Sequence, residues 1–308
     1  MVCSKLWLVR VRLAATMLAL CAPLAACGEE SAGGGDALHV VATTGQAADF
    51  ARVVGGERVH VTGLLAPNAD PHAFELRPDD VRELSDAKLV VRSGGELDEW
   101  LEEAIDGAGG DAEVIALADS VAGDDPHWWQ DPRNAVSAVG ALRGALAAAH
   151  PDGADSFRRA AGAYVERLRR LDREVARCIA EIPPARRTLV TTHDALGAYA
   201  RRYGLRVVGT VIPSRSTAGQ PSAGEVAALV ATIRRERVQA IFPERSVAPD
   251  IEDAIARETG ARVGRPLWVD TLGPDGSDGA TYVDSIASNT AAIVEGLSGG
   301  ATTCRPAA

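Results

Sequence analysis

The sequence has 308 residues, a formal net charge of -10, 46% hydrophobic residues and only 4% aromatic residues. A chain of this length and composition can bury the cores of two domains of ordinary size. Its acidic balance argues against nucleic acid or an anionic membrane surface as a partner, because both repel negative charge.

The first 26 residues predict a lipoprotein signal peptide. Basic residues precede an apolar run over residues 13–24, which is too short to span a bilayer as a permanent helix. The following Leu-Ala-Ala-Cys resembles a lipobox, in which Cys27 is lipidated and becomes the mature N-terminus; the alternative is an ordinary signal peptide with a chance cysteine. Residues 27–37 predict a flexible tether. We therefore expect an extracytoplasmic protein, attached to the outer face of the cell membrane through Cys27 only.

Strand and helix patterns alternate over residues 38–152. Helical patterns at residues 46–54, from Pro78, and at 95–105 separate short runs rich in β-branched residues. The runs that predict strands are Leu38–Thr44, Arg58–Leu65, Lys88–Gly94 and Ala112–Leu117. This alternation predicts an N-terminal α/β lobe with a parallel sheet.

One long amphipathic helix is predicted from Asp155 to Ala180, because apolar residues recur there at three- and four-residue steps. Pro183 and Pro184 end it, so we assign residues 153–184 to a backbone helix that links two lobes.

A second α/β series predicts a C-terminal lobe over residues 185–298, closed by a helix from Tyr282 to Leu297 and followed by a tail over 299–308. Its predicted strands are Thr188–Thr192, Leu205–Ile212, Val238–Glu244 and Arg265–Asp270. The predicted fold class is thus α/β, with two Rossmann-like lobes of parallel sheet and helices joined by one long backbone helix.

Two of the five cysteines, Cys178 and Cys304, remain once the signal peptide is removed and Cys27 carries lipid. In an oxidising compartment this pair suggests a disulfide that ties the C-terminal tail to the body of the protein. The alternative is two separate thiols, with Cys178 filling the apolar face of its helix.

Three histidines and one aspartate occupy loops next to strands and helices. His72 and His193 each follow a predicted strand, His127 precedes a helix, and Asp270 ends the last predicted strand. Open α/β sheets bind ligands at the carboxyl ends of their strands, so these side chains from two lobes could meet around one ion.

The residues around these histidines suit an ion site. Proline precedes both His72 and His127, which stiffens the loops and lowers the entropic cost of ordering ligands. Asp70, Asp125 and Asp194 are close in sequence and could accept the second ring N–H of a ligand histidine, fixing its tautomer.

Six segments resemble the solute-binding proteins of zinc and manganese ABC importers, a bilobal family with a rigid helical backbone. They occur in the family's order, from about Leu38 to the closing helix: ADPHAFELRPDD, KLVVRSGGELDEWL, DPHWWQDPRNA, HDALGAYARRYGL, IFPERSV and LWVDTLGPDG. The resemblance implies that His72 and His127 of the N-terminal lobe, with His193 and Asp270 of the C-terminal lobe, hold a metal ion.

The resemblance also implies that a monomer delivers the captured ion to an ABC transporter membrane permease. It places Glu244 near the site, where it supports a ligand, contacts the other lobe, or is a salt-bridged acid. Two features differ from parts of the family. The stretch before His127 lacks the His-rich loop of some zinc-binding members, and manganese-type members tend to have glutamate where His193 stands.

Three imidazoles and one carboxylate favour Zn2+, which accepts four such ligands tetrahedrally. Mn2+ prefers more oxygen, although a bidentate Asp270 could accommodate it, so a manganese carrier is the alternative. A secreted zinc metalloenzyme is the alternative of a different class. The sequence has no His-Glu-x-x-His or Gly-x-Ser-x-Gly motif, and four protein ligands would close the site. Trp128 and Trp129 form the sole aromatic cluster, which argues against an organic solute or a metal chelate.

Overall fold

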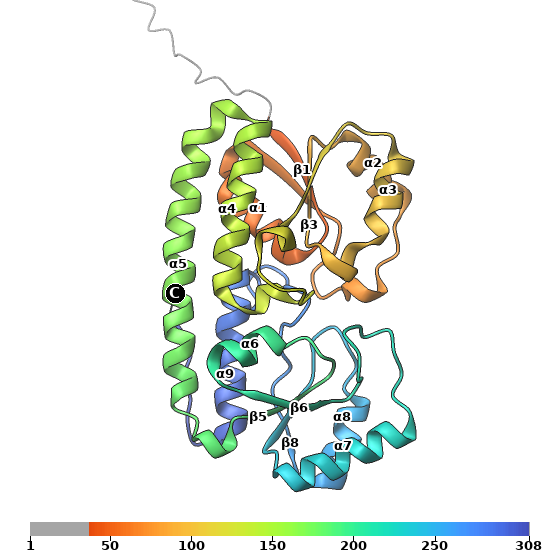
Figure 1. Cartoon of the computed structure of the whole chain (residues 1–308), viewed down its shortest axis with the longest axis vertical. Helices are drawn as coiled ribbons and strands as arrows, with labels where there is room; N and C mark the ends of the chain where they lie inside the picture. The colour runs from red at the N-terminus through yellow and green to blue at the C-terminus, as the bar shows by residue number, and fades with distance from the viewer. Residues whose placement is uncertain (1–36, 308) are drawn as a thin grey trace, which may run out of the picture. The chain divides into compact units, whose positions relative to one another are not determined.

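The computed structural model describes residues 37–307 (Figure 1). The expected signal peptide, Cys27 and all but the last residue of the expected tether lie outside the described residues. No helix in the described part combines the length and the apolar character needed to cross a membrane.

Two four-stranded parallel sheets form the centres of two lobes. The strand order is β2-β1-β3-β4 in the first sheet and β6-β5-β7-β8 in the second, so the two lobes share one topology. The strands are β1 (Leu38–Ala42), β2 (Val59–Gly63), β3 (Leu89–Arg92), β4 (Glu113–Ala116), β5 (Thr188–Thr191), β6 (Arg206–Thr210), β7 (Ala240–Phe242) and β8 (Arg262–Val263). The predicted fold class is confirmed.

Helices cover both faces of each sheet (Figure 1). The α-helices are α1 (Gly45–Gly55), α2 (Pro78–Asp86), α3 (Trp100–Ala108), α4 (Pro132–Ala149), α5 (Ala154–Ala180), α6 (Gly197–Tyr203), α7 (Ala223–Glu236), α8 (Asp250–Thr259) and α9 (Tyr282–Ser298). Short 3-10 turns at Pro71–Ala73 and Trp128–Gln130 lie in loops that carry candidate ligands.

One continuous hydrophobic core runs through both lobes. Side chains alternate between the two faces of a strand. In β1, Val40 faces the continuous core and Val41 faces α2 and α3. In β5, Leu189 faces the continuous core and Val190 faces α7 and α8. Helices α1, α4, α5, α6 and α9 all contribute to the continuous core. The two lobes therefore share one buried interior.

Two helices connect the lobes, although the sequence predicted only one. Helix α5 buries the predicted apolar stripe, and α9 packs alongside it (Figure 1). The first residue of α9 reaches the N-terminal lobe: the Tyr282 N–H donates to Asp49 of α1 at 3.1 Å, and its hydroxyl donates to the Trp129 carbonyl at 2.5 Å. Helix α9 therefore belongs to both lobes.

The predicted strand Arg265–Asp270 is wrong. The fourth strand of the second sheet is β8, just before it, and Leu267 makes only an isolated bridge with Glu244. Pro266 lacks the N–H that a ladder would use. The backbone of Trp268 is instead satisfied by Asn289 of α9, whose side chain accepts from its N–H at 2.8 Å and donates to its carbonyl at 2.6 Å.

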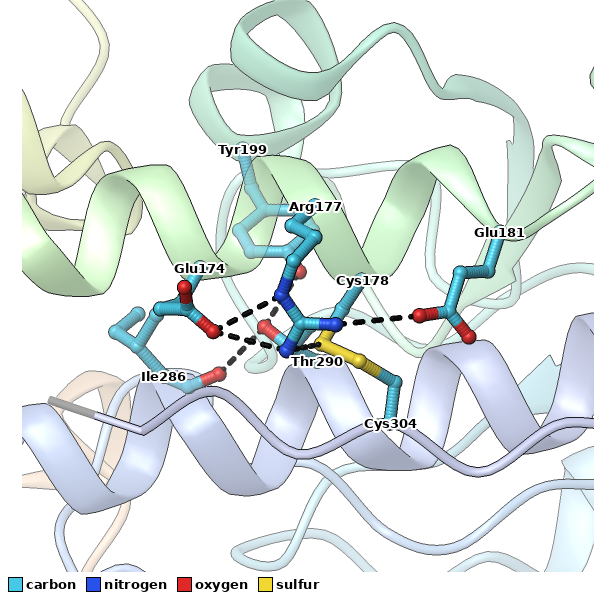
Figure 2. Close-up of a disulfide and its surroundings, with 8 residues drawn as sticks. All are labelled: Glu174, Arg177, Cys178, Glu181, Tyr199, Ile286, Thr290 and Cys304. Carbon is cyan, nitrogen blue, oxygen red and sulfur yellow. Dashed lines mark hydrogen bonds and ion pairs between the residues drawn. A yellow bond between two sulfur atoms is a disulfide. The ribbon is translucent and has the colours of Figure 1, made fainter.

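A disulfide joins Cys178 of α5 to Cys304 of the tail (Figure 2). Both cysteines are buried, and the bond links positions that are 126 residues apart. Arg177 lies over it and forms ion pairs with Glu174 at 2.8 Å and Glu181 at 3.3 Å. The disulfide thus closes a loop that contains the whole second sheet and α9.

Candidate metal centre

The four candidate ligands converge between the two sheets. His72 lies in the loop after β2 and His127 in the loop before α4, while His193 follows β5 and Asp270 follows the bridge at Leu267. One ligand atom from each residue lies within 4.8 Å of all the others. The structure therefore brings together the four residues that the sequence singled out.

Asp270 lies at the centre of this cluster. Its Oδ2 is 3.2 Å from His72 Nε2 and 3.1 Å from His193 Nε2, and its Oδ1 is 3.5 Å from His127 Nε2. The Nε2 atoms of His127 and His193 are 3.2 Å apart. All three imidazoles thus point the same ring nitrogen at one carboxylate.

The cluster is almost completely excluded from solvent. The His127 and His193 side chains are 0% exposed, Asp270 is 1% exposed and His72 is 10% exposed. Asp270 Oδ1 is buried and has no hydrogen-bond donor among the described residues. Burying an unpaired carboxylate oxygen is costly, so this atom suits a cation.

The two histidines of the N-terminal lobe are presented by identical Asp-Pro-His turns. Asp70 Oδ1 accepts the backbone N–H of His72 at 2.9 Å, and Asp125 Oδ1 accepts that of His127 at 3.1 Å. This corrects the expected role of both aspartates. The turn aims each carboxylate at the backbone two residues later, as in Asx turns, rather than at the ring; Asp125 stays 3.9 Å from His127 Nδ1.

Glu244, at the carboxyl end of β7, holds the His193 ring. Its Oε1 accepts the Nδ1–H of His193 at 2.6 Å and the His193 backbone N–H at 3.2 Å. This contact leaves Nε2 free to face Asp270 and fixes the tautomer that a metal ligand needs. Asp194, expected in that role, is an exposed residue, and Glu244 takes the ring N–H instead, so this expectation is also corrected.

Two residues that sequence reasoning missed position Asp270. Trp129 Nε1 and Gln130 Nε2 both donate to the Val269 carbonyl, at 3.0 Å and 2.8 Å. The turn that follows His127 therefore binds the backbone next to Asp270, in the other lobe, through two hydrogen bonds. The only signal in the sequence was the polar Gln130 beside the tryptophans.

Charge and burial set the protonation of the cluster. Burial lowers the pKa of His127. Burial also disfavours charge on His193, but the carboxylates of Asp270 and Glu244 outweigh it and raise the pKa of that imidazole to about 10. Burial raises the pKa of Glu244, whereas His127 and His193 overcome the burial of Asp270 and hold its pKa well below the usual range. The centre therefore keeps one ionised carboxylate among the imidazoles.

This donor set can hold one transition-metal ion. Three imidazole nitrogens and a carboxylate match the ligands that zinc takes in closed tetrahedral sites. A site already assembled in the folded chain pays little ordering entropy when it binds.

Comparisons with known proteins show which family the chain is similar to. A family model described as "Zinc-uptake complex component A periplasmic" matches residues 40–296. The chain is 32% identical to the manganese-binding lipoprotein MntA of Bacillus subtilis (strain 168), over 89% of this chain and 95% of that protein. It is also 32% identical to the zinc-binding protein TroA of Treponema pallidum (strain Nichols), over 84% of this chain and 88% of that protein.

One solved structure is similar to this chain in both sequence and fold. The periplasmic zinc-binding protein TroA from Treponema pallidum superposes with a TM-score of 0.80 at 31% sequence identity, covering 85% of this chain and 99% of that one. The match to the family model, over residues 40–296, spans both lobes and the positions of all four candidate ligands.

Proposed function

The chain belongs to the family of periplasmic components of zinc-uptake complexes, and from this membership we propose that it captures zinc outside the cytoplasm and delivers it to the membrane permease of an ABC importer. The resemblance seen in the sequence is confirmed. The observation that carries the proposal is the buried convergence of His72, His127, His193 and Asp270 on one point.

Zinc is preferred because three of the four donors are imidazole nitrogens. A manganese carrier of the same class is the second candidate, supported by one observation. Both oxygens of Asp270 face imidazoles, at 3.1 to 3.5 Å, so the carboxylate can bind an ion through two atoms and supply a fifth donor. The relatives include one named for zinc and one named for manganese.

The ion is held as cargo between lobes, with two ligands from each. The family consists of transport components, and four protein ligands leave no open position for a catalytic water, so we propose no enzymatic step. Handover requires the permease to separate ligands of one lobe from those of the other. The relative MntA is named a lipoprotein, which supports attachment of this chain to the membrane through a lipidated Cys27. A monomer suffices, because one chain supplies the whole donor set.

A metal competition tests the proposal. Purified protein is stripped with chelator, offered zinc and manganese together, and analysed for bound metal. We expect one zinc per chain, and either His72→Ala or His193→Ala should abolish its binding. His60 is an exposed histidine of β2, so the control variant His60→Ala should still bind one zinc. Manganese held in preference to zinc would favour the second candidate, and a protein that holds neither would contradict both.

The same assay separates ligands from supporting residues. Glu244→Ala should cost zinc affinity about 10- to 100-fold, the usual range for a group that orients a ligand. His193→Ala should cost more, because it removes a donor atom. Equal losses would mean that His193 is not the fourth ligand.

A further inference from the structure

We propose that two hydrogen bonds across the lobe interface, Thr217 to Asp70 and Arg201 to Asp125, set the rate at which the site releases its ion. The inference rests on the proposed function and goes beyond it by assigning positioning roles to Thr217 and Arg201. We call these two hydrogen bonds the interlobe ties.

The first tie runs through the turn that presents His72. Asp70 Oδ1 accepts the His72 N–H at 2.9 Å, and its other oxygen, Oδ2, accepts the Thr217 hydroxyl at 2.5 Å. Thr217 lies in the loop between β6 and α7 of the C-terminal lobe. The half-buried Asp70 carboxylate thus binds the His72 backbone with one oxygen and Thr217 of the opposite lobe with the other.

The second tie repeats this arrangement at His127. Asp125 Oδ1 accepts the His127 N–H at 3.1 Å, and Oδ2 accepts from Arg201 Nη2 at 2.8 Å. Arg201 belongs to α6 of the C-terminal lobe. Its side chain is 69% exposed and that of Asp125 is 23% exposed, so water and salt weaken this tie more than the first.

The first tie lies beside the most exposed of the four ligands. His72 is 10% exposed, whereas the other three ligands are at most 1% exposed. A pocket of about 200 Å³ lies against His72, lined in part by Glu96, Trp100 and Arg215. Arg215 is two residues before Thr217, so the loop that carries the tie also borders this pocket. Displacing His72 to let the ion leave therefore requires the Asp70–Thr217 hydrogen bond to break or stretch.

Thr217→Val removes the hydroxyl with little change in shape. Release of zinc into excess chelator, followed by stopped flow, should become about tenfold faster, the effect of a hydrogen bond to a charged acceptor. The association rate should stay the same, and so should the Co2+ absorption spectrum, because all four ligands remain. Thr217→Ser should restore slow release. Arg201→Gln should accelerate release by no more than about fivefold.

Two control variants remove similar groups that bond only within the C-terminal lobe. Thr232→Val deletes a hydroxyl that accepts from Arg235, and Arg206→Gln deletes a guanidinium that pairs with Glu236. Both should release zinc at the wild-type rate.

The outcomes that overturn the inference are distinct from failure of the proposed function. Wild-type protein that binds zinc, with Thr217→Val releasing it no faster than Thr232→Val, would overturn the role of the tie and leave zinc capture standing. An altered Co2+ spectrum in Thr217→Val would also overturn it, since the ligand set itself would have changed. Wild-type protein that binds neither zinc nor cobalt would contradict the proposed function.

Discussion

His193 has a carboxylate at each nitrogen of its ring: Asp270 lies 3.1 Å from Nε2 and Glu244 lies 2.6 Å from Nδ1. Their charges raise the pKa of the imidazole to about 10 although burial opposes this. The ring is therefore protonated at neutral pH in the ion-free protein. A metal ion has to displace that proton from Nε2, because only the unprotonated nitrogen binds metal.

We therefore expect zinc binding at pH 8 to release about one proton from His193. The lowered pKa of His127 leaves that ring neutral beforehand, and the lowered pKa of Asp270 leaves the carboxylate ionised, so neither contributes. His193 holds this proton at any pH below its pKa of about 10. Because zinc has to displace one proton, zinc affinity should fall about tenfold for each unit that the pH drops below that value. Calorimetry in two buffers of different ionisation enthalpy measures the proton count, and a count of zero would contradict this account.

The sequence identified the ligands of the centre better than it identified their supports. His72, His193 and Asp270 stand out because each follows a strand or an extended segment, and that placement can be read locally. Thr217 lies 147 residues from Asp70, and Arg201 lies 76 residues from Asp125. Contacts of this kind depend on how two lobes pack, which no local pattern describes.

At the scale of elements, α5 shows how much a periodic pattern can predict. It was expected from Asp155 to Ala180 and runs from Ala154 to Ala180, because its apolar stripe is continuous and prolines follow it. The span of α9 across both lobes could not be predicted. Its buried residues surround the helix and include Ser288, Asn289 and Thr290, so they do not form one stripe that points to one neighbour.

The disulfide between α5 and the tail should matter for stability and not for metal binding. Closing a loop of this length removes about 4–5 kcal/mol of chain entropy from the unfolded state. Cys178→Ser should lower the urea midpoint to that of the reduced wild-type protein and leave zinc affinity unchanged, because neither cysteine borders the centre. Cys304→Ser serves as the matched control and should give the same midpoint. Variants as stable as the oxidised wild type would show that the bond contributes little.

At the scale of the whole described chain, the continuous core opposes large movement of one lobe against the other. Two helices, α5 and α9, contribute side chains to it along with both sheets. Opening a wide cleft between the lobes would expose buried apolar surface. The free-energy cost is about 25 cal/mol for each Å² exposed. A few hydrogen bonds at the centre would not offset a large cost of this kind, so we expect the ion to enter and leave through small shifts of loops and lobes.

Small-angle X-ray scattering of the ion-free and zinc-loaded protein tests this expectation. The two radii of gyration should agree closely, because the lobes stay packed through α5 and α9. A marked compaction on loading would show a hinge closure that the shared core does not allow. Protein loaded with zinc and then stripped provides the control for irreversible change.

The ion-binding residues are spread over the chain, and Asp270 comes 198 residues after His72. A ribosome therefore supplies the only carboxylate of the set after it has translated most of the second lobe. Shorter nascent chains carry the three imidazoles but lack the carboxylate that lies among them, and Cys304, which closes the disulfide, is added later still. A nascent chain that ends before residue 270 therefore cannot offer all four donor groups of the centre.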